Sequence, residues 1–292
     1  MGWQVGGKGV AITGAGGVIG RALGVALARG GARTLLALDL NLAAAQAAAA
    51  EMEAASGGRC TVRSQQLDAS DGPALAVALR QADAANPIDL FCANAGILVP
   101  GDCTDTASGS GWQKSWSLNV MQTAVAAEVL IPRMVERGGG AILVTASAAG
   151  LLSQLGSAPY TATKHAAVGL AEWLAISHAH QGVHVCCLCP QAVAGTDMLG
   201  QLEGEFTDAA SQQLAAALRA AALDGLLDPH AIAEEAIACL ARGIFLCVPG
   251  GEEAALRHVR RKEADRERWI SAMRKLQARL IGKPGVSPRS KL

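Results

Sequence analysis

The sequence predicts an α/β protein built on a doubly wound, parallel, seven-stranded sheet of the Rossmann-like type. Short apolar segments bounded by glycine or proline alternate with Ala- and Leu-rich helical patterns along the chain. Apolar segments such as AILVTA and VHVCCLC are hydrophobic throughout, as expected of strands that helices cover on both faces. Strand-helix alternation of this kind favours right-handed crossovers and a parallel sheet. We therefore expect one domain over residues 1–251.

The elements follow from these patterns in order. Strands are predicted at 9–13, 34–39, 60–67, 88–93, 141–146, 183–189 and 244–248. Helices are predicted between them, near 18–30, 41–55, 72–85, 114–137, 159–181 and 229–242. Residues 197–227 form an Ala- and Leu-rich insertion after the sixth strand, and we expect this insertion to be a lid over a cleft.

Residues 252–292 form a basic tail, with twelve Lys and Arg against five Asp and Glu. Apolar residues recur in it at three- and four-residue steps, at Trp269, Met273, Leu276 and Leu280. This spacing predicts an amphipathic helix that docks by one stripe, followed by a flexible end. A solvated basic face is favoured over phosphate or partner binding.

Composition excludes several classes of protein. The chain of 292 residues carries 25 Lys and Arg against 25 Asp and Glu, so its neutral charge argues against nucleic-acid binding by the whole domain. A hydrophobic content of 51% excludes extensive disorder. The Ala-rich stretches 43–50 and 215–222 are too short to span a membrane, and the N-terminus lacks a secretory signal pattern.

The cysteines and the chain end indicate a compartment. Eight cysteines lie mostly in apolar runs and suit reduced, buried thiols. The last residues, Ser290-Lys291-Leu292, match the address read by the peroxisomal import receptor. We expect a peroxisomal protein if the source is eukaryotic and a cytoplasmic one otherwise.

A glycine-rich turn follows the first predicted strand and opens a helix, over Thr13–Gly20. Glycines allow the backbone to approach a pyrophosphate, whose charge meets free N–H groups and the positive end of the helix dipole. Asp39 ends the second strand about 20 residues later, where a carboxylate can accept hydrogen bonds from an adenosine ribose. Because this carboxylate would repel a 2′-phosphate, we expect NAD rather than NADP.

Acid-base chemistry is indicated by the segment Tyr160-Thr161-Ala162-Thr163-Lys164. On a helix, this spacing sets the phenol and the ammonium one turn apart on the same face. A neighbouring cation favours the phenolate, so we expect Lys164 to lower the pKa of Tyr160 toward a useful range. Ser147, at the end of the fifth strand, is a candidate partner, and Tyr160 is the one tyrosine in the chain.

Over residues 8–250 the chain resembles the short-chain dehydrogenase/reductase family, through the order and spacing of these motifs together with QLDAS, CANAG and SLNVM. The resemblance implies catalytic roles for Asn119 (a proton relay through water), Ser147 (binding the reacting oxygen), Tyr160 (the acid/base) and Lys164 (binding the nicotinamide ribose and tuning Tyr160). It implies cofactor contacts at Gly14, Gly17, Val18, Ile19, Gly20, Asp39, Asp68 (the adenine edge), Asn94, Ala95, Gly96, Tyr160, Lys164, Pro190, Val193 and Thr196. It also implies a homotetramer or homodimer built on the helices near 114–137 and 159–181.

The resemblance has departures. Val18 stands where the family usually has glycine, and the Gly14, Gly17, Gly20 spacing looks more like a longer branch that includes NAD-dependent sugar-nucleotide epimerases. Pro190-Gln191 replaces the usual Pro-Gly.

The expected activity is therefore NAD-dependent oxidation of a secondary alcohol, or the reverse, on a hydrophobic small molecule. If the chain end is read as a peroxisomal address, an acyl-chain, hydroxyacyl-CoA or lipid-derived alcohol is favoured, and the phosphates of a CoA substrate would meet Arg260 and Arg261. An epimerase-like enzyme and a catalytically silent NAD-binding scaffold are the alternatives.

No metal site is expected. Cys186 and Cys189 have C-x-x-C spacing, but they lie in a strand pattern without a second pair, so we interpret them as core thiols. His178 and His180 are two residues apart on a helical pattern and point in different directions.

Overall fold

A computed structural model describes residues 2–101, 109–196, 209–223, 225–250 and 255–281. Its sheet contains seven parallel strands in the order β3-β2-β1-β4-β5-β6-β7. The strands are β1 (Gly9–Thr13), β2 (Thr34–Asp39), β3 (Thr61–Gln66), β4 (Leu90–Ala93), β5 (Gly140–Thr145), β6 (Val183–Leu188) and β7 (Leu246–Cys247). The strand order reverses direction between β1 and β4, which is where open parallel sheets bind ligands.

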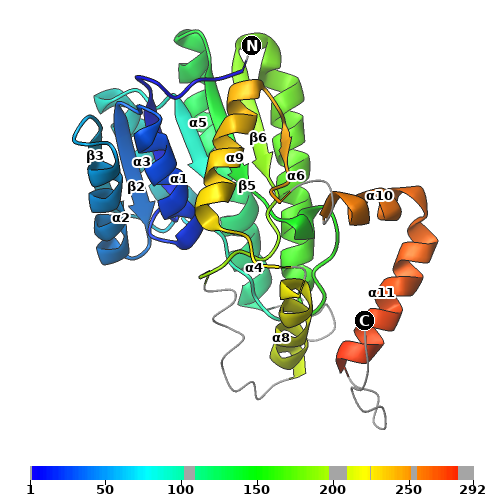
Figure 1. The fold of residues 1–292 in the computed structure, drawn as a ribbon. Helices are drawn as coiled ribbons and strands as arrows, with labels where there is room; N and C mark the ends of the chain where they lie inside the picture. Colours follow the sequence, from blue (N-terminus) through cyan, green and yellow to red (C-terminus); the bar gives the residue numbers. More distant parts are fainter. Residues whose placement is uncertain (1, 102–108, 197–208, 224, 251–254, 282–292) are drawn as a thin grey trace.

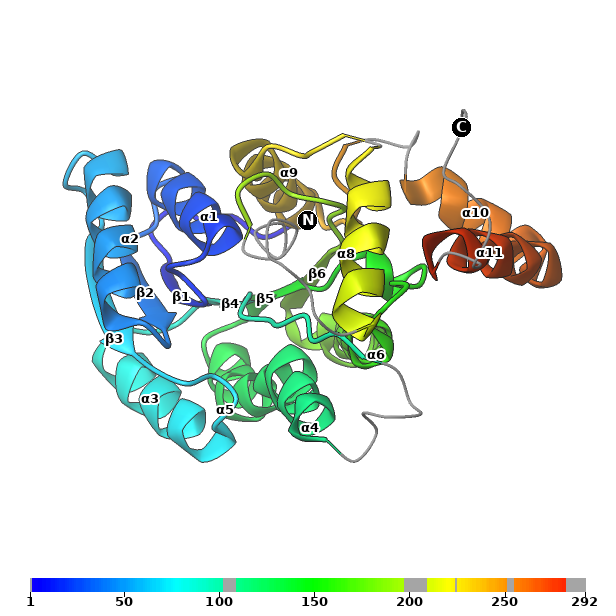
Figure 2. The same ribbon diagram turned by 90° about the horizontal axis from the view of Figure 1, so that it is seen from below.

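Helices cover both faces of this sheet (Figure 2). On one face lie α1 (Val18–Arg29), α2 (Leu42–Ala55) and α9 (Pro229–Arg242). On the other lie α3 (Gly72–Ala85), α5 (Gln122–Glu136) and α6 (Ala158–His178). The continuous hydrophobicity of the inner strands follows from this double cover, because every residue of β1, β4 and β5 is buried.

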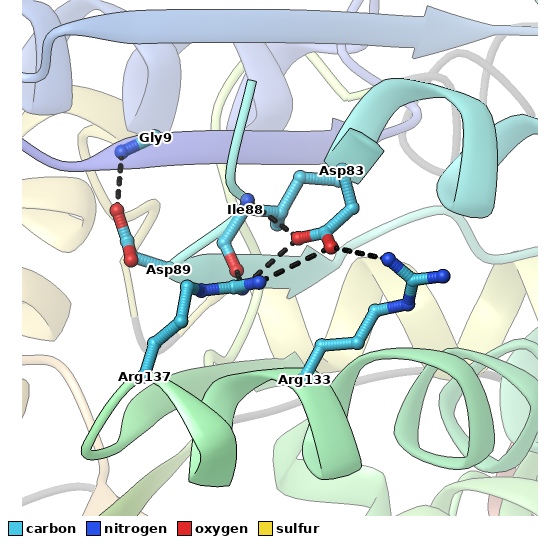
Figure 3. A network of polar contacts seen from close by, with 6 residues as sticks. All are labelled: Gly9, Asp83, Ile88, Asp89, Arg133 and Arg137. Carbon is cyan, nitrogen blue, oxygen red and sulfur yellow. Dashed lines mark hydrogen bonds and ion pairs between the residues drawn. The ribbon is translucent and has the colours of Figure 1, made fainter. Parts of the chain in front are cut away.

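A charged cluster joins α3 to α5 (Figure 3). The buried Asp83 carboxylate accepts hydrogen bonds from the guanidinium groups of Arg133, at 3.2 Å, and Arg137, at 2.9 Å. It also accepts the backbone N–H of Ile88 at 2.9 Å, just before β4 begins. The carboxylate is thus fully paired, and it fixes the start of β4 against both helices.

The sequence predicts the elements well and their ends less well. The helix expected from residue 114 begins earlier, with α4 (Ser110–Trp116), and continues through a π-helical turn, η1 (Ser117–Met121), into α5. The strand expected at 244–248 is a two-residue β7. Short 3₁₀ turns, η2 (Ala148–Gly150) and η3 (Ala179–Gln181), follow β5 and α6.

Two expected segments are partly described. The expected lid 197–227 contains α8 (Ala209–Ala222), while 197–208 lie outside the described residues. The expected tail helix is two helices, α10 (Arg257–Ala264) and α11 (Arg266–Ile281), which extend from the sheet edge that carries β7 (Figure 1). The C-terminal Ser290-Lys291-Leu292 lies outside the described residues. Among the helices that are described, none has the length and hydropathy needed to cross a membrane.

Candidate active site

A cavity of about 820 Å³ opens at the carboxyl ends of the strands. The turn after β1, the ends of β2, β4 and β5, and the first turns of α6 line it on one side. Residues of α8, α10 and α11 line the other side. Its volume is at the upper end of the range for small-molecule sites, which suits a site that holds two molecules together.

The glycine-rich turn is packed too closely for side chains. Gly14 has φ +61°, and a β-carbon there would lie 2.9 Å from the Cα of Ala95. A β-carbon on Gly20 would lie 2.1 Å from the carbonyl oxygen of Gly14. Gly17, the N-cap of α1, gives the helix no side-chain cap. The first N–H groups of α1 therefore face the cavity without a side-chain acceptor, as in an anion-binding turn.

Two carboxylates stand beside this turn. One oxygen of Asp39 accepts the N–H of Gly16 at 2.9 Å, and the other accepts the N–H of Asn41 at 2.9 Å. Asp68 accepts the backbone N–H and the hydroxyl of Ser70, and these hydrogen bonds lower the pKa of its carboxyl below the usual value. Both side chains line the cavity.

Thr13 organises the strand ends. Its hydroxyl donates to the side-chain oxygen of Gln122 at 2.8 Å and accepts the N–H groups of Asn94 and Ala95. The Asn94 amide donates to the carbonyls of Thr13 and Gly14, and its oxygen accepts the Thr145 hydroxyl at 3.1 Å. These contacts tie β1, β4 and β5 together under the cavity, and they involve three polar residues that the sequence did not single out: Thr13, Gln122 and Thr145.

Tyr160, Ser147 and Lys164 meet on the cavity wall. Ser157 caps α6 by accepting the N–H of Tyr160 at 3.2 Å, which fixes the tyrosine in the first helical turn. The Tyr160 hydroxyl is hydrogen-bonded to Ser147. The Lys164 Nζ lies 5.6 Å from the centroid of the Tyr160 ring and donates to the carbonyl of Thr145 at 2.9 Å.

Burial dominates the electrostatics of this group. Tyr160 is 4% exposed, and burial raises the pKa of its phenol, while the hydrogen bond to Ser147 acts in the opposite direction. The lowering of this pKa that the sequence led us to expect from Lys164 is therefore not found: desolvation has the largest effect on the phenol, and Lys164 is not among the groups that shift its pKa. Burial also lowers the pKa of Lys164, to about 8.

Asn119 lies behind the cavity wall. Its amide oxygen accepts the N–H of Ile97 at 2.9 Å, and its amide nitrogen donates to the carbonyl of Ile97 and to the Thr163 hydroxyl, each at 3.0 Å. It belongs to the π-helical turn η1, a feature that is frequent at functional sites. A β-carbon on Gly96 would lie 3.1 Å from its oxygen and 3.3 Å from the Lys164 Nζ, so only glycine leaves both groups in place.

Helix α8 covers the tyrosine. Leu214 and Leu218 pack in one buried cluster with Tyr160. The helix approaches the backbone of Gly156 so closely that a β-carbon there would lie 2.6 Å from the Cα of Leu214. The described part of the expected lid therefore packs over Tyr160.

The predicted site residues converge. Except for the buried Asn119, all of them line this one cavity: Gly14, Gly17, Val18, Ile19, Gly20, Asp39, Asp68, Asn94, Ala95, Gly96, Ser147, Tyr160, Lys164, Pro190, Val193 and Thr196. The sequence did not indicate that residues of α11 share the cavity with them. The sequence predicted the amphipathic stripe of this helix, but it did not predict which surface the stripe would face.

The cysteine motif is a feature of the core. Cys186 and Cys189 belong to clusters on opposite faces of the sheet, because they are an odd number of residues apart along one strand. Cys187 and Cys189 share a face, with 3.8 Å between their sulfur atoms. The described cysteines are free and buried, which agrees with their interpretation as core thiols.

Comparison with known proteins agrees with this geometry. The family model for short chain dehydrogenases matches residues 8–205. An inactive 2-(S)-hydroxypropyl-CoM dehydrogenase 2 of Xanthobacter autotrophicus is 34% identical over 236 residues, which are 78% of this chain and 98% of the relative. A 2-keto-3-deoxy-L-fuconate dehydrogenase of Xanthomonas campestris is 35% identical over 67% of this chain and 61% of the relative.

Among solved structures, a short chain dehydrogenase/reductase of Burkholderia phymatum in complex with NAD has a similar fold. It superposes with a TM-score of 0.77 and 29% identity, over 91% of this chain and 96% of that one.

Proposed function

The chain belongs to the short-chain dehydrogenase/reductase family, and we propose that it is an NAD-dependent oxidoreductase that interconverts a secondary alcohol and a ketone on a hydrophobic small molecule. The observation that carries this proposal is the contact of the Tyr160 hydroxyl with Ser147, with Lys164 beside them, in the same cavity as the glycine-rich turn.

The cavity residues fit a nicotinamide dinucleotide. The turn at Gly14 and Gly20 leaves no room for side chains, and it presents the start of α1 to the cavity, as a pyrophosphate requires. Asp39 and Asp68 would hold the adenosine, and Lys164 the nicotinamide ribose. When bound, the nicotinamide accepts or returns the hydride.

The charge around Asp39 favours NAD over NADP. Its carboxylate lies at the end of β2, beside the turn, where a 2′-phosphate would meet a like charge. Arg21, beside the same turn, is already engaged, because it donates to the carbonyl of Gly16 and pairs with Glu51 at 2.7 Å. We expect NAD to bind at least tenfold more tightly than NADP. Asp39→Asn should bring the two Kd values closer together by strengthening NADP binding. Equal Kd values for both cofactors in the unaltered protein would contradict the preference.

The chain's own groups supply the proton chemistry. In alcohol oxidation, the Tyr160 oxygen takes the proton of the substrate hydroxyl, while the Ser147 hydroxyl donates to the reacting oxygen. Ser147 is held for this role because its oxygen accepts the N–H of Ala149 at 3.1 Å. Lys164, anchored on Thr145, offers a cation beside the phenolate that takes up this proton and that forms again in the reverse reaction. Helix α8 keeps water away from this exchange.

Absorbance of NADH tests the proposal. The protein would be mixed with NAD and a panel of secondary alcohols, hydroxyacyl-CoAs and hydroxysteroids, with Tyr160→Phe as the control. Turnover that falls at least a hundredfold in the variant supports the proposal, because the acid-base group is then required. Tight NAD binding without net NADH would move the assignment to the epimerase-like enzyme or the silent scaffold.

The assembly and the location are also proposals. Large apolar side chains are exposed on α4, η1 and α6, at Trp116, Met121, Trp173 and Ile176. We infer that these helices join copies of the chain in a homodimer or homotetramer, which light scattering would report as a multiple of 29.7 kDa. Ser290-Lys291-Leu292 would direct the protein to peroxisomes in a eukaryotic cell, and a fluorescent fusion that ends in these residues, compared with its deletion, tests this.

A further inference from the structure

The helices beyond the family-model match suggest what the substrate looks like. That match ends at residue 205, yet the cavity is lined also by α11 through four apolar residues: Trp269, Met273, Leu276 and Leu280. These are the residues that recur at three- and four-residue steps, and they are half-buried, as are Ile270 and Gln277 beside them, while the remaining residues between them are exposed. The stripe therefore faces the site that contains Tyr160.

The opposite wall is apolar as well. On α8, the lining residues are Ala217, Leu218, Ala220 and Ala221, and the loop after η2 adds Leu152 and Leu155. Helices α8 and α11 contact each other, and the C-terminal end of α11 is the part that comes nearest to α8 (Figure 1). From Trp269 to Leu280 the stripe runs for about 16 Å, at the rise of an α-helix. The walls form an apolar slot that leads away from the reacting oxygen.

The root of this C-terminal arm is fixed to the catalytic helix. Lys262 of α10 is 7% exposed, and its Nζ donates to the carbonyl of Leu151 at 2.6 Å. The same nitrogen lies 3.3 Å from Nε2 of His165, the residue that follows Lys164 on α6. Nδ1 of His165 lies 2.9 Å from the carbonyl of Thr161, so Nδ1 carries the proton and Nε2 accepts from Lys262. Ala255 packs in the core beside Ala148, below the same loop.

We propose that the C-terminal arm, α10 and α11, selects substrates with a long apolar body, which lies between α8 and α11 while its secondary alcohol or ketone meets Tyr160. This inference rests on the proposed function, and it identifies α10 and α11 as the part of the chain that determines substrate size. Met273 and Leu276 are specificity residues in this slot, and Lys262 is a positioning residue that holds the slot against α6.

A matched pair of substitutions tests the slot. Leu276→Asp puts a carboxylate on the stripe, whereas Ala272→Asp adds the same charge to the exposed face of the same helix. The substrates are 2-alkanols from four to twelve carbons, with NAD at saturation. In the unaltered protein, kcat/KM should rise by up to about fourfold per added methylene as the chain enters the slot.

We expect Leu276→Asp to flatten this rise and to lower kcat/KM at least tenfold for the longest alcohols, with less than a twofold change for 2-butanol. Ala272→Asp should follow the unaltered protein. A second pair, Lys262→Met against Arg257→Met at an exposed position of the same helix, should show the same contrast, as an increase in KM at unchanged kcat. If both members of each pair behave alike, or if long and short alcohols lose activity by the same factor, the inference is overturned.

Binding separates this inference from the proposed function. Calorimetric titration with 2-alkanones in the presence of NADH measures occupancy of the slot without turnover. Chain-length-dependent binding that Leu276→Asp abolishes supports the slot even where no alcohol is oxidised, in which case only the proposed function fails. Turnover with no chain-length effect in either protein leaves the function standing and rejects the slot.

Discussion

The contact between Gly156 and α8 gives a direct test of whether α8 completes the active site. Gly156 has φ +82°, and a β-carbon there would lie 2.6 Å from the Cα and 2.7 Å from the backbone nitrogen of Leu214. Neither atom belongs to a flexible side chain, so Gly156→Ala must displace the helix. Because Leu214 packs against Tyr160, that displacement opens the cover of the acid-base group.

The free-energy cost of Gly156→Ala has two parts. A left-handed backbone with a β-carbon costs about 1–2 kcal/mol, and this cost appears as lost folding stability. Overpacking a close contact costs about 1–3 kcal/mol, and here it falls on the docking of α8. If the active form requires α8 to be docked, the second part lowers kcat/KM by about 5- to 150-fold.

Gly138→Ala is the matched control, because Gly138 has φ +89° and a β-carbon there would have nothing within 4 Å. It should lose the same stability in urea denaturation and keep its kcat/KM. Gly156→Ala should lose both, and limited trypsin digestion should cut α8 at Arg219 sooner. Equal kcat/KM and equal digestion for the two variants would refute the role of α8 as a cover.

Three further outcomes follow from the contacts of other elements. Gly20→Ala places a β-carbon against a backbone carbonyl and should weaken NAD binding at least a hundredfold by calorimetry, whereas Gly24→Ala meets only the flexible end of Met52 and should change Kd less than threefold. Asp83→Ala leaves the N–H of Ile88, two residues before β4, without its acceptor and should cost about 2–3 kcal/mol in urea denaturation, with the NAD Kd unchanged. Burial lowers the pKa of Lys164 from 10.5 to about 8, so the unfolded chain binds more protons between these values and stability should rise with pH from about 8 toward 10.5. Lys164→Met should remove that part of the slope, and identical pH profiles for the two proteins would reject it.

The cofactor half of the site could be predicted from the sequence because its signals are local. Gly14 is required by its positive φ and Gly20 by a backbone contact within the same turn, and Asp39 ends the strand that neighbours β1. A residue type at a fixed spacing therefore specifies the geometry. Thr13 and Gln122 were missed for the opposite reason: their hydrogen bond joins residues 109 positions apart, and threonine and glutamine occur in many unrelated settings.

The pKa of Tyr160 also depends on contacts between residues that are far apart in the sequence. The spacing to Lys164 predicts a nearby cation, and the structure has it, but the direction of the shift depends on how far the phenol is removed from water. The buried cluster around the phenol includes Leu214 and Leu218, more than fifty residues later, together with Leu98 and Ala149. Local spacing fixes which groups meet, whereas the packing of distant helices decides which protonation state they favour.

The apolar stripe on α11 was predicted from the sequence, but the surface that it faces was not. Periodicity from Trp269 to Leu280 predicts that one face is covered, but it does not say by what. In the structure, these side chains line the cavity that contains Tyr160, but they are only half-buried there. A helix whose docking served stability alone would bury its apolar face more completely. The apolar surface that α11 leaves open toward Tyr160 is therefore best explained by a ligand that covers it during the reaction.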